Sequence, residues 1–371
     1  MKWLVVALLL GHGGIHGMGV AKGLRWAELP ELTLPVSRLA AVVWGGALLL
    51  LVAAAGLRMA DASSWWWVAG LGLLVSQAMI TTAWADARYG TLANMLLALA
   101  VVHGALSMGP TSYRARYYEV VRTHLAERTV GAVVTEADLA KLPEPAARYL
   151  RASGAVGRPS PTLFEAHWRG RIRSNEASPW MTLDAVQVNH TRAPSRHFLM
   201  DATLFGLPAQ GLHAYVDVEA WMSVKLFSLV PVARASGPEM TKGETVSLLN
   251  DMAVLVPSAL LQPAVRWEPV DDRSFRVVYS VGSHTVAAVC IIDEAGHLVD
   301  FVSDDRGMLQ DDGSIEVLRW STPVEDPVER AGFTVPSRGV ARWHPDGGAS
   351  FNYIELELID LRVDGEGPAL R

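Results

Sequence analysis

Hydrophobic residues dominate the first 108 positions of the chain, whereas polar and apolar residues alternate over most of the remainder. Four stretches of the first region are almost entirely apolar: residues 3–21, 39–59, 64–84 and 91–108. Each is close to the roughly 20 residues that a helix needs to cross about 30 Å of hydrocarbon. The pattern predicts that residues 1–108 form an α-helical membrane region of about four spans.

The first apolar stretch also has the three parts of a signal peptide, because Lys2 precedes it and Gly19-Val20-Ala21 ends it. The glycines and histidines of residues 11–17 favour a membrane helix instead, since they are unusual in a signal core. Two pairs of glycines have the four-residue spacing that allows close contact between helices. They are Gly13 and Gly17, and Gly19 and Gly23. We therefore expect a packed membrane helix.

The basic residues beside the apolar stretches give two answers about sidedness. Around the first stretch, Lys22, Arg25 and Arg38 outweigh Lys2, which places this loop in the cytoplasm and the C-terminal part outside. Three arginines after residue 108 favour the opposite orientation, and they are Arg114, Arg116 and Arg122. Because those arginines can belong to a folded helix, the first loop carries more weight. The expected orientation therefore places the soluble domain outside the cytoplasm.

Residues 109–134 show helical spacing of apolar side chains and are predicted to form an amphipathic connector. Apolar residues then recur at every second position, as at Phe164 and Ala166, which is typical of half-buried β strands. One segment, residues 241–261, shows helical spacing instead. The pattern predicts an α+β soluble domain over residues 135–371, in which helices pack against a large antiparallel sheet of about ten strands.

Charge and cysteine content exclude several classes of function. The formal net charge of the chain is −6 and no basic run occurs, which argues against nucleic acid as a partner. Cys290 is the only cysteine, so neither an intrachain disulfide nor a multi-cysteine zinc site can form. It lies in an apolar run and is expected to be a buried, unreactive side chain.

Several segments resemble a large bacterial family of unknown function. In the soluble part they are LPEPAARYLRASG at 142–154, SGPEMTKGE at 236–244, VPSALL at 256–261 and RWEPVDDRS at 266–274. Three further features resemble the multi-span members of that family: the first span with its paired histidines, ELPELTLPVSR at 28–38 and DARYGTLANM at 86–95. The resemblance thus extends over nearly the whole chain.

The resemblance implies a soluble domain with the half-barrel architecture of the LolA and LppX lipoprotein carriers, in which helices close a curved antiparallel sheet. It also implies a location in the bacterial inner membrane with an extracytoplasmic soluble domain, and it implies no catalytic residue. The chain departs from the family pattern at Val254-Leu255-Val256, where aromatic residues usually precede Pro257. The shape of any pocket near Pro257 is therefore left open by the resemblance.

His12 and His16 are the strongest candidates for a functional site in the apolar region. Their spacing places both imidazoles on one face of a membrane helix, where ionisable residues are costly and often functional. The pair suits a metal, a haem or a proton relay, and His103 and Asp86 are candidate partners. The alternative is that each histidine hydrogen-bonds a neighbouring helix and only fixes packing.

The soluble part carries no GxSxG, HExxH, phosphate-loop or CxxC motif, so no cofactor is implied and enzymatic activity is not favoured. The candidate ligand-binding residues lie on the predicted internal helix or close to it in the sequence. They are Glu239, Glu244, Leu249, Pro257 and Trp267. The two glutamates could instead cap the N-terminus of that helix.

Three functions compete at this stage. The first is a membrane-anchored module that binds a lipid or other apolar ligand in a half-barrel cavity, with membrane lipids, an apolar small molecule or a lipoprotein as partners. The second is a membrane redox or transport component that uses His12 and His16. The third is a structural or signalling protein without a ligand.

Overall fold

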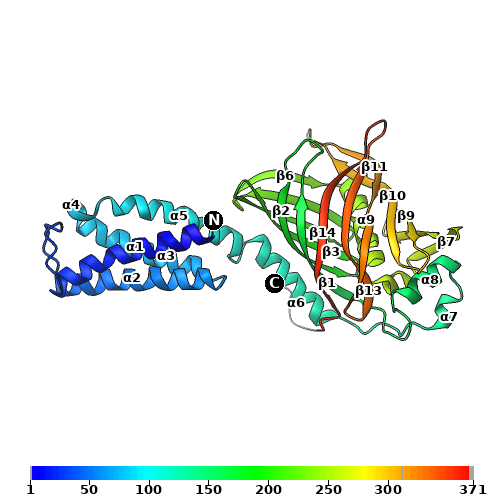
Figure 1. The fold of residues 1–371 in the computed structure, drawn as a ribbon, viewed down its shortest axis with the longest axis horizontal. Helices are drawn as coiled ribbons and strands as arrows, with labels where there is room; N and C mark the ends of the chain where they lie inside the picture. The colour runs from blue at the N-terminus through cyan, green and yellow to red at the C-terminus, as the bar shows by residue number, and fades with distance from the viewer. Residues whose placement is uncertain (1, 311, 367–371) are drawn as a thin grey trace. The chain divides into compact units, whose positions relative to one another are not determined.

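The computed structural model describes residues 2–310 and 312–366. The predicted region 1–108 therefore begins on a residue outside the described ones, at position 1. The predicted region 135–371 ends on such residues, at positions 367–371. The chain divides into two compact units, Met1–Ala115 and Arg116–Arg371 (Figure 1). The first unit is helical and the second is rich in β strands, and each is described separately.

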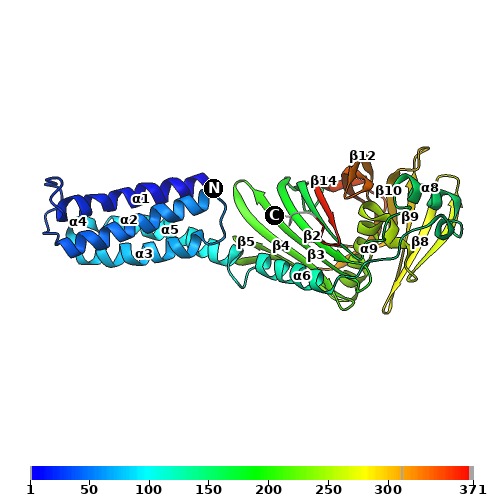
Figure 2. The same ribbon diagram turned by 90° about the horizontal axis from the view of Figure 1, so that it is seen from below.

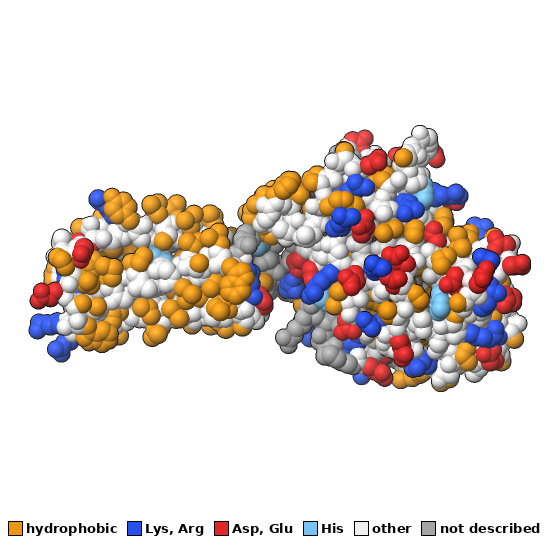
Figure 3. All heavy atoms as spheres, viewed as in Figure 1, with side chains coloured by type: hydrophobic (Ala, Val, Ile, Leu, Met, Phe, Trp, Pro, Cys, Tyr) orange, Lys and Arg blue, Asp and Glu red, His pale blue; other side chains and the backbone are white. Residues whose placement is uncertain are grey.

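Helices of the first unit pack side by side as a bundle (Figure 2). The long ones are α1 (Lys2–Gly23), α2 (Arg38–Met59), α3 (Trp65–Thr82) and α5 (Gly90–Met108), with the short α4 (Trp84–Ala87) before α5. Large apolar side chains cover much of the outer surface of this bundle, as Figure 3 shows for one face. Exposed examples are Leu4, Leu39, Leu49, Leu74 and Leu92. An apolar exterior of this kind suits a hydrocarbon environment rather than water.

Within the part of the chain that the structure describes, three helices are long and apolar enough to cross a membrane: Lys2–Gly23, Arg38–Met59 and Gly90–Glu127. The last of these combines α5 with α6 (Tyr113–Glu127). The predicted span at residues 64–84 does form a helix, α3, but it is not among the three. On the Kyte–Doolittle scale its three tryptophans and Gln77 count as polar, which lowers the mean hydropathy of its 18 residues. The prediction of about four spans is therefore approximate.

Glycines of α1 allow α2 to approach closely. A Cβ atom on Gly19 would lie 2.7 Å from Cγ of Trp44, and one on Gly23 would lie 2.6 Å from Cβ of Ala41. Gly13 is similarly close to Leu51, at 3.3 Å. The predicted role of these small residues in helix contact is confirmed.

Replacing Gly19 by leucine is expected to destabilise the helical bundle by about 1–3 kcal/mol, because the new side chain would occupy the space of the Trp44 ring. The midpoint of thermal unfolding of the purified protein in detergent measures this effect. Gly14→Leu is the matched control, since a Cβ atom there meets nothing within 4 Å. Equal midpoints for the two variants would contradict the assigned helix contact.

Within its described residues, the second unit is built on one antiparallel sheet of 14 strands. The first six are β1 (Leu163–Ile172), β2 (Met181–His190), β3 (Ser195–Leu204), β4 (Leu207–Val216), β5 (Glu219–Leu226) and β6 (Val230–Ser236). The others are β7 (Val265–Asp271), β8 (Ser274–Val281), β9 (His284–Ile292), β10 (Leu298–Leu309), β11 (Ile315–Ser321), β12 (Val324–Arg330), β13 (Phe333–His344) and β14 (Phe351–Val363). The strand order is β6-β5-β4-β3-β2-β1-β14-β13-β11-β10-β9-β8-β7, and β12 pairs with β13.

The sheet curves into a half-barrel (Figures 1 and 2). The predicted fold class, apolar N-terminal helices followed by a curved antiparallel half-barrel with helices, is confirmed. The expectation of about ten strands was too low. The β4–β5 hairpin shows why, because Asp217 and Val218 make its turn with positive φ angles of 52° and 61°. Residues other than glycine rarely adopt such angles, so this turn leaves little trace in the sequence.

Helix α9 (Pro238–Leu255) lies inside the half-barrel, and the 3-10 helix η1 (Pro257–Leu261) continues it (Figure 2). The predicted helix at 241–261 thus begins three residues earlier and changes type after Leu255. Side chains on all sides of α9 are buried, and Leu248, Leu249 and Met252 are inaccessible to solvent. Two short helices, α7 (Glu136–Leu139) and α8 (Glu144–Ala152), precede the first strand. Cys290 is fully buried in the same core, as expected.

Helix α6 covers part of the convex face of the sheet. Its Tyr117 and Val121 are buried, and Nε2 of His124 lies 2.9 Å from Oγ of Ser195 on β3. Because side chains alternate along a strand, Ser195 and His197 face α6 whereas Arg196 and its even-numbered neighbours face α9. The compact unit accordingly begins within α6, at Arg116.

The buried His197 gives the second unit a pH dependence. Burial, together with the nearby His124 and Arg116, lowers the pKa of His197 from 6.5 to about 3. The unfolded chain therefore binds a proton at this position below about pH 6.5, while the folded chain stays neutral. Since the unfolded state binds more protons, the contribution of His197 to stability falls as the pH falls from 6.5 towards 3.

Between pH 7.5 and pH 5, His197 is expected to reduce the free energy of unfolding by about 2 kcal/mol. Denaturant unfolding of the wild type and of His197→Phe at both pH values measures the difference. Asp300, whose pKa burial raises to about 6, acts in the opposite direction but equally in both proteins. A wild type and variant with the same pH dependence would show that His197 is not held neutral.

Candidate functional site

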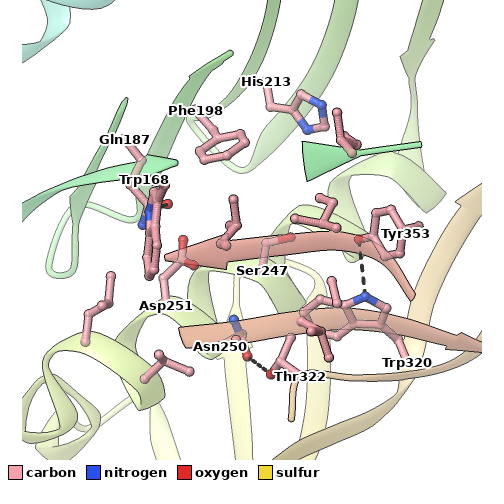
Figure 4. A pocket seen from close by; sticks show the side chains of 18 of the residues that line it. Trp168, Gln187, Phe198, His213, Ser247, Asn250, Asp251, Trp320, Thr322 and Tyr353 are labelled. Carbon is pink, nitrogen blue, oxygen red and sulfur yellow. Dashed lines mark hydrogen bonds between the residues drawn. The ribbon is translucent and has the colours of Figure 1, made fainter. Parts of the chain in front are cut away.

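A cavity of about 170 Å³ lies between α9 and the concave face of the sheet. Its lining comes from α9 and from strands that are distant in the sequence (Figure 4). The lining residues labelled in Figure 4 are Trp168, Gln187, Phe198, His213, Ser247, Asn250, Asp251, Trp320, Thr322 and Tyr353. The site exists because the half-barrel wraps around a helix that does not fill it completely.

Aromatic and aliphatic side chains form most of the cavity wall. Trp168, Phe198 and Met200 come from β1 and β3, and Val254 comes from α9. Trp320 Nε1 donates to the hydroxyl of Tyr353 at 3.2 Å, so this indole shows only its apolar ring to the cavity. Walls of this kind bind hydrocarbon by removing it from water.

A network of buried charges borders the cavity. Arg196 donates through Nε to Asp251 at 2.6 Å and through Nη1 to Glu244 at 2.9 Å. His213 contacts the second oxygen of Glu244 at 3.1 Å, and Asn189 donates to Asp251 at 2.9 Å. Side chains from three strands are thus fixed to α9 by charge-assisted hydrogen bonds.

The Glu244 carboxylate is held ionised by its partners. Burial alone would raise its pKa, but Arg196 and His213 outweigh burial and hold the pKa of Glu244 well below its usual range. Burial alone would lower the pKa of Arg196, but the carboxylates of Asp251 and Glu244 raise it above its ordinary value. The pair is therefore charged throughout the physiological pH range.

Two hydrogen-bond donors of the lining residues have no partner within the described residues. Trp168 Nε1 can only donate, and it donates to Oε1 of Gln187 at 3.1 Å. The Gln187 amide nitrogen Nε2 therefore points away from the Trp168 indole. This Nε2 is buried and unpaired. The second donor is Nε of Arg306 on β10. Unpaired buried donors are uncommon and favour a ligand that supplies acceptors.

Arg306 is fixed in place by other contacts. Its guanidinium lies over the Trp320 ring, 4.5 Å from the centroid, and its Nη1 donates to the carbonyl oxygen of Gly243 at 2.8 Å and to Ser247. Thr322 meanwhile donates to Asn250 at 2.6 Å. These contacts fix the guanidinium of Arg306, and with it the position of the unpaired Nε.

The predicted ligand-binding residues occupy different positions around α9. Glu244 belongs to the buried charge network, whereas Glu239 is exposed near the start of the helix. Leu249 and Pro257 are buried in the core but do not line the cavity. Trp267 on β7 is partly buried against Phe275, with ring centroids 5.5 Å apart, and also does not line it. Glu244 does not line the cavity either, but it is bonded to Arg196 and His213, which do.

Sequence reasoning missed the polar residues that most distinguish the cavity: Gln187, Arg196, His213, Asp251 and Arg306. They lie on five different elements, and only the pairing of strands brings them together. One signal was present for Arg196. It stands two residues before Phe198 and four before Met200, at an inward position of the same strand, where a charged side chain needs a buried partner.

The candidates from the apolar N-terminal region lie in the helical unit. His12 and His16 are buried and contact each other, with ring centroids 4.7 Å apart. Together with Asp86 they border a separate groove, whose lining does not include His103. Among residues 2–310 and 312–366, no cluster of three or more histidine, cysteine, aspartate or glutamate side chains could hold a metal ion.

Comparisons with known proteins match the β-rich unit to a family and to solved structures. A family described as a family of unknown function (DUF6544) matches residues 132–356. Among solved structures, a domain from Vibrio parahaemolyticus described for outer membrane lipoprotein sorting has 11% identity and a TM-score of 0.34, covering 62% of this chain and 95% of its own. A DUF1329 family protein from Desulfovibrio piger has 12% identity and a TM-score of 0.34, covering 64% and 96%. The comparison with curated proteins gave no match.

Proposed function

We propose that this chain, which belongs to a family of unknown function (DUF6544), is a membrane-anchored protein whose half-barrel binds an acyl chain bearing an ester or amide carbonyl. The observation that carries the proposal is the cavity under α9, which is lined by an apolar wall and by two residues, Gln187 and Arg306, that each keep a buried, unpaired hydrogen-bond donor. The hydrocarbon would lie against the aromatic wall, and the carbonyl oxygen would accept hydrogen bonds from Gln187 and Arg306.

Charge balance favours a neutral carbonyl over a free carboxylate. Two guanidinium groups, Arg196 and Arg306, and the carboxylate of Asp251 line the cavity, and a second carboxylate, Glu244, pairs with Arg196 beside it. Their charges cancel, so a buried carboxylate ligand would add an unmatched negative charge, which is costly in a water-poor site. An acylated molecule such as a phospholipid or a lipoprotein has the required neutral carbonyl.

The size of the cavity limits how much of the ligand it holds. An engineered apolar cavity of about 150 Å³ takes up a single benzene molecule. The cavity of about 170 Å³ therefore suits one segment of a chain, with its carbonyl, rather than an entire lipid. A longer chain would require α9 to move away from the sheet, or would leave part of the lipid outside.

The source of the ligand is proposed to be the membrane itself. The three apolar helices would anchor the protein there, in an inner membrane with the half-barrel on the extracytoplasmic side. The tips of two neighbouring hairpins expose apolar side chains: Phe205 between β3 and β4, and Leu229, Val230 and Val232 in the β5–β6 hairpin. Apolar tips of this kind could enter the headgroup region and give an acyl chain a route from the bilayer.

The proposal is tested by mass spectrometry of small molecules extracted from the half-barrel unit, residues 116–371, after its purification without detergent. An acylated lipid at a stoichiometry near one is expected. Its absence, together with no stabilisation of the unit by phospholipids or acyl esters of several chain lengths, would remove the proposed function.

A further inference from the structure

A second cavity lies within the helical unit and is independent of the half-barrel. It is a groove of about 590 Å³, within the range of ligand sites, lined mainly by apolar side chains of α1, α2, α3 and α5 and of the loop before α2. His12, His16, Trp44 and Tyr89 are among the residues that line it. Its polar groups at positions 12 and 16 distinguish it from a simple packing defect.

The hydrogen bonds of His16 determine which of its nitrogens carries a proton. Nδ1 lies 2.9 Å from the carbonyl oxygen of His12, which can only accept, so Nδ1 is the protonated donor. In the neutral ring Nε2 then carries a free lone pair. This atom is buried and has no partner, although the side chain borders the groove and is 2% exposed.

His12 presents the same arrangement through its other nitrogen. Its Nε2 lies 2.7 Å from Oδ1 of Asn94, whose Nδ2 donates to Gln77 at 3.0 Å. Ser76 also donates to Oδ1 of Asn94 at 3.1 Å. The oxygen of Asn94 therefore accepts from Nε2–H of His12, which leaves Nδ1 of His12 as a buried, unpaired acceptor.

We propose that this groove binds a hydroxyl-bearing amphiphile, such as a phenol or an alcohol on a hydrocarbon chain, whose O–H group donates to Nε2 of His16. A neutral imidazole with its N–H already engaged offers a lone pair, so the ligand has to supply a donor. The apolar lining takes the hydrocarbon, and burial strengthens the hydrogen bond because water is excluded.

The groove favours this ligand class over a cation. The two oxygens of Asp86 accept from the hydroxyl of Thr33 at 2.6 Å and from the backbone nitrogen of Leu34 at 2.8 Å, so this carboxylate already stabilises the loop. Although Glu31 and Asp86 also line the groove, no three histidine, cysteine, aspartate or glutamate side chains among the described residues are grouped so as to hold a metal ion. A neutral hydroxyl needs neither a carboxylate nor a third ligand.

The experiment compares two probes on the full-length protein in lipid nanodiscs. 4-Decylphenol donates one hydrogen bond, and its methyl ether has a similar shape but no donor. The wild type is expected to bind the phenol about tenfold more tightly than the ether, the usual effect of one buried hydrogen bond. His16→Phe keeps an aromatic ring beside Trp44 and is expected to abolish this preference.

Two control variants keep the test specific. His103→Phe removes a histidine that does not line the groove, and Ala341→Phe obstructs the cavity of the half-barrel. Both are expected to retain the preference for the phenol, which separates this site from the proposed acyl site. If His16→Phe fails to fold, the proposal is tested by whether the wild type binds 4-decylphenol more tightly than its methyl ether. Equal binding of the two probes, or an equivalent of copurifying metal that His16→Phe loses, would overturn the proposal.

Discussion

Replacing Arg196 by leucine is expected to destabilise the half-barrel by about 3–5 kcal/mol, an effect large enough to unfold much of the protein at 37 °C. The substitution would leave Glu244 and Asp251 as buried carboxylates without their guanidinium partner. Removing one member of a buried ion pair has this magnitude because the remaining charge keeps its desolvation cost. Denaturant unfolding monitored by tryptophan fluorescence measures it.

Arg169→Leu is the matched control. Arg169 pairs with Asp184 at 3.2 Å, but both side chains are more than half exposed. Its removal is expected to change the stability by less than about 1 kcal/mol, the usual value for a surface pair. If the two variants unfolded at the same denaturant concentration, the network around α9 would not be the buried charge cluster described above.

Replacing Ala341 by phenylalanine is expected to weaken the binding of an acyl ester about thirtyfold. Ala341 on β13 lines the cavity, so the larger ring would occupy space needed by the hydrocarbon. Displacing about three methylene groups removes roughly 2 kcal/mol of hydrophobic free energy, which corresponds to that change in Kd. Fluorescence titration of the purified half-barrel with an acyl ester carrying an environment-sensitive dye measures it.

The control for the cavity variant is Ala233→Phe on the edge strand β6, which does not line the cavity. A second comparison is Gln187→Leu, which preserves the volume of the side chain but removes the unpaired donor. We expect normal binding for the first and about tenfold weaker binding for the second. Unchanged binding in Ala341→Phe would place the ligand elsewhere.

The elements whose patterns are local could be predicted from the sequence. Long apolar runs indicated the N-terminal helices, and alternation at Phe164 and Ala166 indicated the antiparallel strands. Segments such as those at 142–154 and 236–244 carried the resemblance to a family of unknown function, which the match over residues 132–356 confirms.

The cavity could not be predicted because it depends on contacts between distant residues. Arg196 and Asp251 are 55 positions apart, and no single-sequence pattern specifies that pair. Leu249 was a predicted ligand-binding residue, but α9 is buried on all sides, so the apolar spacing of the helix does not reveal which face borders the cavity. Val254 occupies that face instead.

The most direct test of the central claim is photo-crosslinking of the half-barrel with an acyl ester that carries a diazirine near the end of its chain. Peptide mass spectrometry then locates the labelled residues. We expect labels on cavity residues such as Met200, Val254 and Leu356, competed by unlabelled ester and lost in Ala341→Phe. Labels confined to the exposed hairpin tips, or unaffected by that variant, would contradict an acyl site between α9 and the sheet.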